Sequence, residues 1–120
     1  MRILIIGGTR FIGPHIVRSL SNEGHDISLF HRSKSKIDLP NGVKHLLGDR
    51  QKLVEFSDQF KDLAPHLVLD MFPVTEQDAK EVVDIFNGVA KRIVAISSQD
   101  VYRAYGKLIG IEDCSIEPFL

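Results

Sequence analysis

The sequence predicts an α/β protein with a doubly wound parallel sheet, and two observations support this fold class. Short apolar runs alternate with segments of helical periodicity along the 120 residues. A glycine-rich turn also separates the first apolar run, residues 3–6, from the first helical segment. Strands and helices that alternate at this spacing form right-handed βαβ units, whose strands lie parallel in one sheet. We expect about five strands in the order 3-2-1-4-5, with the chain ending before a sixth strand.

The first strand and helix are joined by the sequence Gly7-Gly-Thr-Arg-Phe-Ile-Gly13. Residues 3–6 are continuously apolar, which is typical of a parallel strand buried on both faces. Glycines permit the tight turn that follows such a strand. The helix, at about residues 11–23, then directs its free N–H groups and positive dipole end toward the turn, where a pyrophosphate can bind. Its expected apolar face comprises Ile12, Ile16, Val17 and Leu20, and Gly24 is placed to end it.

The remaining elements follow in regular order. We expect strands at residues 26–31, 43–47, 66–71 and 92–97, with a polar loop over residues 32–42. A helix at about residues 51–62 stops before Pro65, and a second helix starts at a capping box formed by Thr75 and Asp78. The apolar residues at helical spacing in this second helix are Ala79, Val82, Val83, Phe86 and Ala90.

Composition limits the classes of function. The 43% hydrophobic and 26% charged residues are ordinary for a single globular domain. A net charge of −1 creates no field that attracts nucleic acid or an anionic membrane, and no apolar run approaches the roughly 18 residues of a membrane span. The single Cys114 excludes an internal disulfide and fits the reducing cytoplasm, where we expect the protein. The five scattered histidines show no metal-ligand spacing, so we expect no metal site.

The glycine turn resembles the N-terminal fingerprint of the extended short-chain dehydrogenase/reductase superfamily, in its NAD-dependent epimerase/dehydratase group. Common forms of the fingerprint have glycine where this chain has Arg10, and Arg10 is similar to the atypical branch, which includes reductase-like, isomerase-like and chloroplast stem-loop-binding proteins. The resemblance implies a Rossmann-type NAD(P)-binding domain over residues 1–120. It implies cofactor contacts from Gly7, Thr9, Arg10, Phe11, Ile12 and Gly13. The alternative is an ordinary strand–turn–helix connection.

The residues after the second strand indicate which dinucleotide binds. An acid at this place holds a ribose 2′-hydroxyl, whereas arginine accommodates a 2′-phosphate. Here the sequence reads His31-Arg32, followed by Ser33, Lys34 and Lys36. We therefore expect His31 and Arg32 to bind the cofactor, with NADP preferred over NAD. For Lys34 and Lys36 the alternative is a solvated basic loop.

Two further strand ends are expected to contribute to the cofactor site. Asp49, in Gly48-Asp49-Arg50, matches the family position that accepts a hydrogen bond from the adenine amino group, and Arg50 lies beside it. Asp49 is equally suited to cap a helix N-terminus, and the two roles are compatible. After the fourth strand, Met71 is expected to pass near the nicotinamide-side ribose through backbone contacts.

The segment Ser97-Ser98-Gln-Asp100-Val-Tyr102 resembles the family's Ser-Ser-x-x-Val-Tyr stretch after the fifth strand. The match implies a cofactor contact at Ser97 and catalytic positions at Ser98 and Asp100; capping of a following helix is the alternative. The family also uses a Tyr-x-x-x-Lys pair, in which lysine lowers the pKa of tyrosine. Four residues after Tyr102 and Tyr105 come Gly106 and Ile109, so this pair is missing from the chain.

These features predict the NAD(P)-binding portion of an oxidoreductase, epimerase or dehydratase that acts by hydride transfer. The expected substrate in the full-length protein is nucleotide-sugar-like or a small carbonyl or hydroxyl compound. We expect the substrate domain to be absent and the isolated chain to be inactive. The alternatives are a non-catalytic NAD(P)-binding sensor or regulatory module and, against the near-neutral charge, a nucleic-acid binder. An uncovered fifth strand and sheet face predict a homodimer.

Overall fold

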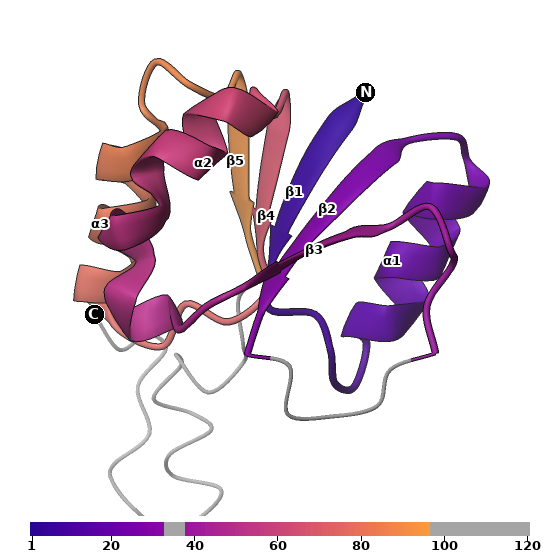
Figure 1. The fold of residues 1–120 in the computed structure, drawn as a ribbon. Coiled ribbons are helices and arrows are strands. Elements are labelled where there is room, and N and C mark those ends of the chain that lie inside the picture. The colour runs from indigo at the N-terminus through magenta and orange to yellow at the C-terminus, as the bar shows by residue number, and fades with distance from the viewer. Residues whose placement is uncertain (33–37, 97–120) are drawn as a thin grey trace, which may run out of the picture.

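The computed structural model describes residues 1–32 and 38–96, and these form a five-stranded parallel sheet (Figure 1). The strand order is β3-β2-β1-β4-β5, which confirms the predicted doubly wound, Rossmann-type topology. The strands are β1 (Arg2–Ile6), β2 (Asp26–His31), β3 (Lys44–Leu47), β4 (Leu67–Asp70) and β5 (Arg92–Ala95). Each neighbouring pair is parallel, so the carboxyl ends of all five strands lie at one edge of the sheet.

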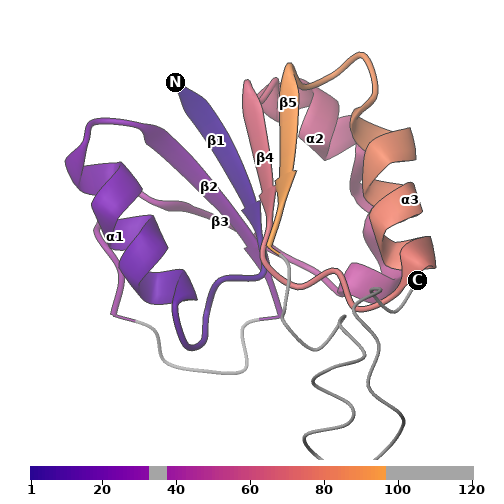
Figure 2. The same ribbon diagram turned by 180° about the vertical axis from the view of Figure 1, so that it is seen from behind.

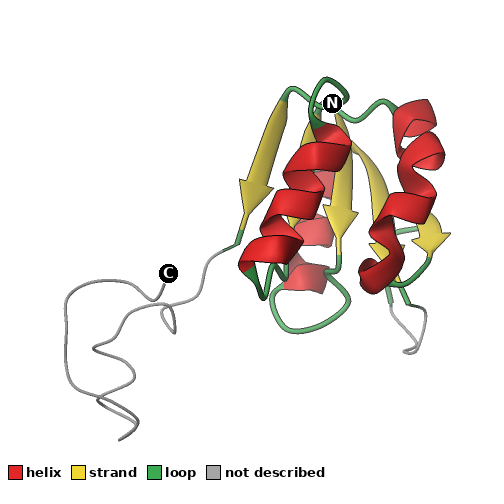
Figure 3. Ribbon diagram, turned by 90° about the vertical axis from the view of Figure 1, so that its left-hand side faces the viewer, coloured by secondary structure: helices red, strands yellow, loops and turns green. Residues whose placement is uncertain are grey.

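Helices cover both faces of the sheet (Figures 2 and 3). Helix α1 (Gly13–Asn22) packs on one face, and the 3₁₀ segment η1 (Arg50–Phe56), α2 (Ser57–Leu63) and α3 (Glu76–Phe86) pack on the other. Each layer has its own core: alternate residues of β1 point into opposite cores, with Ile3 and Ile5 on the α1 side and Leu4 and Ile6 on the α3 side. The two buried layers hold the strand ends in fixed positions.

The helix expected over residues 51–62 is wrong in its first half. The chain there is the 3₁₀ segment η1, and Lys52 inside it has non-helical angles (φ −121°, ψ 32°). Only α2 is regular helix. A 3₁₀ segment aligns residues three apart, which directs Leu53 and Phe56 together into the core on the α3 side.

The apolar face of α3 also differs from the expected one. The predicted capping box is confirmed, because the Thr75 hydroxyl accepts from the Asp78 N–H while the Asp78 carboxylate accepts from the Thr75 N–H. Val82 and Phe86 are buried as expected, but Ala79 and Val83 are exposed, and Ala90 lies beyond the end of the helix. On α3 the residues that pack into the core are Val82, Ile85 and Phe86, because these positions share one side of a helix of 3.6 residues per turn. Val89 and Ala90, just after the helix, pack partly buried against the same core.

Helix α1 is shorter at its start than the sequence indicated. Ile12 is the N-cap and is 54% exposed, whereas Ile16, Val17 and Leu20 pack against the sheet as predicted. Gly24, with φ 88°, lies just beyond the C-cap, where a left-handed residue is favoured. Within the described residues, no helix is long and apolar enough to cross a membrane.

Candidate functional site

The glycine turn between β1 and α1 has a backbone that only glycine adopts easily. Gly7 and Gly8 have φ values of 85° and 92°, in the region that side chains disfavour. The Gly7 N–H donates to the Phe30 carbonyl at 3.0 Å, which fixes the turn to the end of β2. A Cβ at Gly13 would lie 2.4 Å from the backbone of Gly8, so the start of α1 and the turn are in direct backbone contact. Gly7 and Gly8 therefore form the predicted tight turn, and Gly13 lets the start of α1 pack closely against it.

The residues between these glycines form an exposed rim. Phe11 has a positive φ of 54° and is 83% exposed, and Arg10 is exposed beside it. The N-cap Ile12 supplies no side-chain hydrogen bond, and the first turn of α1 contains no acidic residue. The positive dipole at the amino end of α1 is thus not compensated by a carboxylate of its own first turn, which is a favourable electrostatic condition for binding an anion.

The carboxyl end of β2 carries a pair of hydrogen-bonded histidines. His31, which is only 9% exposed, has its Nε2 atom 2.8 Å from Nδ1 of His45 on β3. Burial lowers the pKa of the His31 imidazole below its ordinary value, and the charge of His45 lowers it further. Arg32 follows at the exposed end of the strand, and within the described residues it forms no ion pair. Lys34 and Lys36 lie outside the described residues.

The turn after β3 places Asp49 at the start of η1. Its Oδ1 atom accepts a hydrogen bond from the Gln51 N–H at 2.9 Å, which makes Asp49 an N-cap, one of the two compatible roles foreseen. The preceding Gly48 has no room for a side chain, because a Cβ would lie 2.4 Å from the Phe56 ring. The turn is therefore closely packed on the ring that anchors η1 in the core.

A partly buried ion pair lies beside this turn, and sequence reasoning missed it. Arg50 donates from Nη1 to Oδ1 of Asp70 at 2.5 Å and from Nη2 to Oδ2 at 2.6 Å. Asp70, the last residue of β4, is 1% exposed and also accepts from the Phe72 N–H at 3.2 Å. The available signal was an acid that ends an otherwise apolar strand, since a buried carboxylate requires a partner.

The remaining expected residues fall into two groups. Met71 is buried directly after β4, and a Cβ at Gly7 would lie 3.4 Å from the Met71 Cβ. Ser97, Ser98 and Asp100 lie outside the described residues. The structure thus brings the residues that follow β1, β2, β3 and β4 to one edge of the sheet. Among the described residues, no group of three potential metal ligands occurs.

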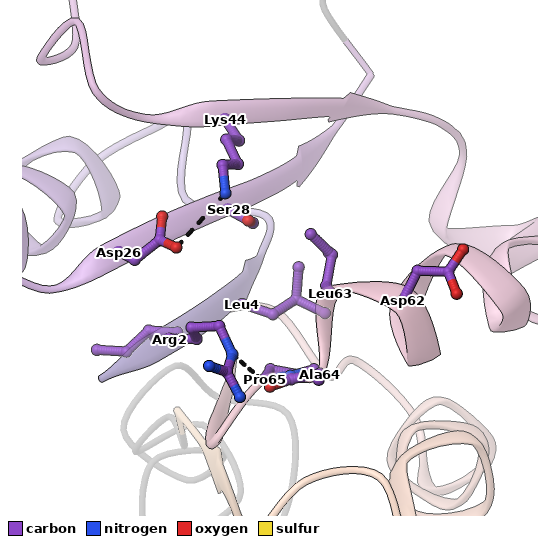
Figure 4. Close-up of a pocket in the computed structure, with 10 residues that line it drawn as sticks. Arg2, Leu4, Asp26, Ser28, Lys44, Asp62, Leu63, Ala64 and Pro65 are labelled. Atoms are coloured by element: carbon purple, nitrogen blue, oxygen red, sulfur yellow. Dashed lines mark hydrogen bonds and ion pairs between the residues drawn. The ribbon is translucent and has the colours of Figure 1, made fainter.

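A cavity of about 310 Å³ opens at the opposite edge of the sheet, beside the amino ends of β1 and β2 (Figure 4). None of the residues expected to bind the cofactor lines it. Three of the charged side chains that line it are engaged within the protein: Lys44 Nζ lies 3.4 Å from Asp26 Oδ2, and Arg2 Nε donates to the Ala64 carbonyl at 2.8 Å. The cavity is therefore separate from the glycine turn.

Comparison with known proteins agrees with this geometry. The family model described as "NAD dependent epimerase/dehydratase family" matches residues 3–119. A protein of Arabidopsis thaliana, the chloroplast stem-loop binding protein of 41 kDa b, is 30% identical over 132 residues, which cover 98% of this chain and 34% of the relative. The chain thus spans about a third of that relative's length.

Solved structures share the fold at lower sequence identity. The Bordetella bronchiseptica enzyme WbmG, in complex with NAD and UDP, has a TM-score of 0.75 and 18% identity; the match covers 99% of this chain and 44% of that one. UDP-glucose 4-epimerase of Thermotoga maritima, with UDP-glucose, has a TM-score of 0.69 and 19% identity, covering 84% of this chain and 39% of the epimerase. At these identities the likeness establishes the fold.

Proposed function

The chain belongs to the NAD-dependent epimerase/dehydratase family, and we propose that it supplies the nicotinamide-dinucleotide-binding domain of an oxidoreductase, epimerase or dehydratase. The observation that carries this proposal is the turn at Gly7 and Gly8, against which Gly13 brings the amino end of α1 into backbone contact. Side chains at Gly7 or Gly8 would strain the turn, one at Gly13 would push α1 away from it, and the first turn of α1 contains no acidic residue that would repel a pyrophosphate. The residues present therefore fit the group that the fold family implies.

The proposed cofactor contacts follow the strand ends. Gly7, Thr9, Arg10, Phe11, Ile12 and Gly13 surround the pyrophosphate, Asp49 accepts a hydrogen bond from the adenine amino group, and Met71 and Ser97 flank the site. Arg50, which the sequence also placed at the cofactor, has both terminal nitrogens engaged by Asp70. When bound, the nicotinamide ring supplies hydride transfer. Ser98 and Asp100 are the proposed catalytic positions. In the whole protein the proposed substrate is a nucleotide-sugar-like or small carbonyl or hydroxyl compound, in line with the UDP and UDP-glucose complexes of WbmG and the epimerase.

We propose NADP as the preferred dinucleotide. The end of β2 presents Arg32, which is exposed, beside His31 and without an acid that would repel a 2′-phosphate. Guanidinium groups bind phosphate with two parallel hydrogen bonds. The WbmG complex contains NAD, so the preference of this chain rests on its own residues at β2.

The test is a titration of the full chain with NADPH and with NADH, followed by nicotinamide fluorescence. We expect NADPH to bind more tightly than NADH. Arg32→Ala should lower the affinity for NADPH by about tenfold or more and leave the affinity for NADH almost unchanged. Lys80→Ala, which removes an exposed cation on α3, is the matched control and should change neither affinity. Tighter binding of NADH would overturn the preference, and absence of binding by either would overturn the proposed function.

A second measurement separates the enzyme from a sensor. With the whole protein, addition of UDP-glucose or a related nucleotide sugar should change the redox state of bound cofactor in an enzyme, visible as nicotinamide absorbance. A sensor would bind the cofactor without that change.

The proposed cytoplasmic location rests on the lone Cys114, whereas the Arabidopsis thaliana relative is named as chloroplastic. That relative is also named as a stem-loop binder, but the net charge of −1 here does not favour nucleic acid.

A further inference from the structure

The Arg50–Asp70 ion pair joins two parts of the sheet that are not neighbours. Arg50 starts η1 just after β3, and Asp70 ends β4, with β2 and β1 lying between these strands. Asp70 and Val68 point to the same face because side chains alternate along a strand, and Val68 belongs to the core on the α3 side. The pair therefore crosses the carboxyl ends of β1 and β2 on that face.

Asp70 also lies next to the glycine turn. It is in register with Ile6, the residue before Gly7, and the Met71 N–H donates to the Ile6 carbonyl at 3.0 Å. The backbone of Asp70 thus lies beside the residue that precedes the turn where the proposed pyrophosphate binds, and its buried carboxylate is on the α3 side of this end of the sheet. An unpaired negative charge at this place would repel the cofactor, and in a buried setting that repulsion is weakly screened.

We propose that Arg50 is a positioning residue, which serves the cofactor site through Asp70 rather than by placing its guanidinium on the cofactor. This inference rests on the proposed function. Both terminal nitrogens of Arg50 are already engaged by the two oxygens of Asp70, in the bidentate arrangement that is the strongest for this pair. Arg50 neutralises the buried charge beside the pyrophosphate.

The same pair fixes two cofactor-facing segments relative to each other. On one side, Arg50 continues directly from Asp49, the proposed adenine contact. On the other side, the Asp70 carboxylate accepts from the Phe72 N–H and so orders the loop between β4 and α3. Loss of Arg50 alone should therefore disturb both ends of the dinucleotide site, whereas a neutral pair of similar volume should preserve it.

The experiment compares Arg50→Met with the double variant Arg50→Met/Asp70→Leu in the full chain, by titration with NADPH and NADH. Arg50→Met should lower the affinity for NADPH and for NADH by roughly tenfold or more, because it leaves the Asp70 carboxylate unpaired. The double variant should bind within about threefold of the wild type, since it removes both charges together. The ratio of NADPH to NADH affinity should stay constant in both variants, unlike in Arg32→Ala.

A double variant that is folded but binds as weakly as Arg50→Met would overturn the inference, since it would show direct contact between Arg50 and the cofactor. Circular dichroism shows whether each variant is folded. If Arg50→Met does not fold, the affinity of the double variant compared with that of the wild type is the test. Arg50→Gln/Asp70→Asn is a second neutral pair for the same comparison. A wild-type chain that binds no dinucleotide would overturn the proposed function, and this inference with it. If the wild type binds a dinucleotide and the folded double variants do not bind it, only the inference is overturned.

Discussion

At the scale of single residues, the backbone around Gly13 leaves no room for a side chain. A Cβ there would lie 2.4 Å from three backbone atoms of Gly8, and backbone cannot move aside as a flexible side chain can. We predict that Gly13→Ala lowers the free energy of unfolding by roughly 1–3 kcal/mol and weakens cofactor binding. Gly42→Ala is the control, because nothing lies within 4 Å of its Cβ position and its φ is not positive. Urea titration measures both variants, and an unchanged Gly13→Ala would contradict the prediction.

The His31–His45 pair predicts a specific dependence of stability on pH. The folded pKa of His31 lies below its unfolded value of about 6.5, so the unfolded chain binds the proton more readily. The stabilising contribution of neutral His31 should be fully present above pH 6.5. The free energy of unfolding should then fall as the pH drops from 6.5 to the lowered folded pKa. A proton on both rings would also remove the acceptor from their 2.8 Å contact.

The pH dependence can be measured as thermal unfolding temperature across this range. His31→Gln should flatten the slope below pH 6.5, whatever its effect on absolute stability. His15→Gln is the matched control, because His15 is exposed on α1 and should leave the slope unchanged. Equal slopes in wild type and His31→Gln would show that His31 does not couple protonation to folding.

At the scale of elements, α3 separates two adjacent valines that sequence periodicity placed on one face. Val82 is 1% exposed and belongs to the core, whereas Val83 is 51% exposed. We predict that Val82→Ala lowers the free energy of unfolding by about 2 kcal/mol, because it removes buried methyl groups and leaves a cavity. Val83→Ala should change it by less than about 0.5 kcal/mol. Chemical denaturation measures the free energy of unfolding of both variants. Equal losses of this free energy would show that α3 is rotated from the described position.

Local patterns predicted what local interactions determine, and the differences have a common cause. The glycine turn and the Thr75 capping box each depend on a few consecutive residues, and the structure confirms them. The strand order, which is also confirmed, follows from the regular alternation of strands and helices along the chain. The Arg50–Asp70 and His31–His45 pairs join residues 20 and 14 positions apart, so no local pattern contains them. The 3₁₀ conformation of η1 likewise depends on the core into which Leu53 packs.

At the scale of the whole molecule, the two cores explain why the candidate site can be built from short strand ends. Apolar side chains fill both faces of β1 completely, from Ile3 to Ile6, so the central strand is fixed from both sides. The exposed apolar side chains Phe11, Phe72 and Val74 follow β1 and β4 at the carboxyl edge. A fixed central strand with exposed groups after its end is an arrangement in which a ligand can bind without unfolding the core.

The edge of the sheet at β5 predicts self-association. This strand is the last of the described sheet, and Val94 is 37% exposed, although its register partner Leu69 on β4 is only 7% exposed. An exposed edge with apolar side chains is a surface on which a second copy can pair. We predict that the 120-residue chain forms a homodimer through β5 and that Val94→Lys weakens the dimer, because pairing would bury the added charge. Val54→Lys is the control, since Val54 is 63% exposed on η1, away from this edge. Sedimentation velocity over a range of concentrations measures both. A monomer at every concentration would exclude the dimer, and dissociation by Val54→Lys instead would place the interface on the α2 and α3 side of the sheet.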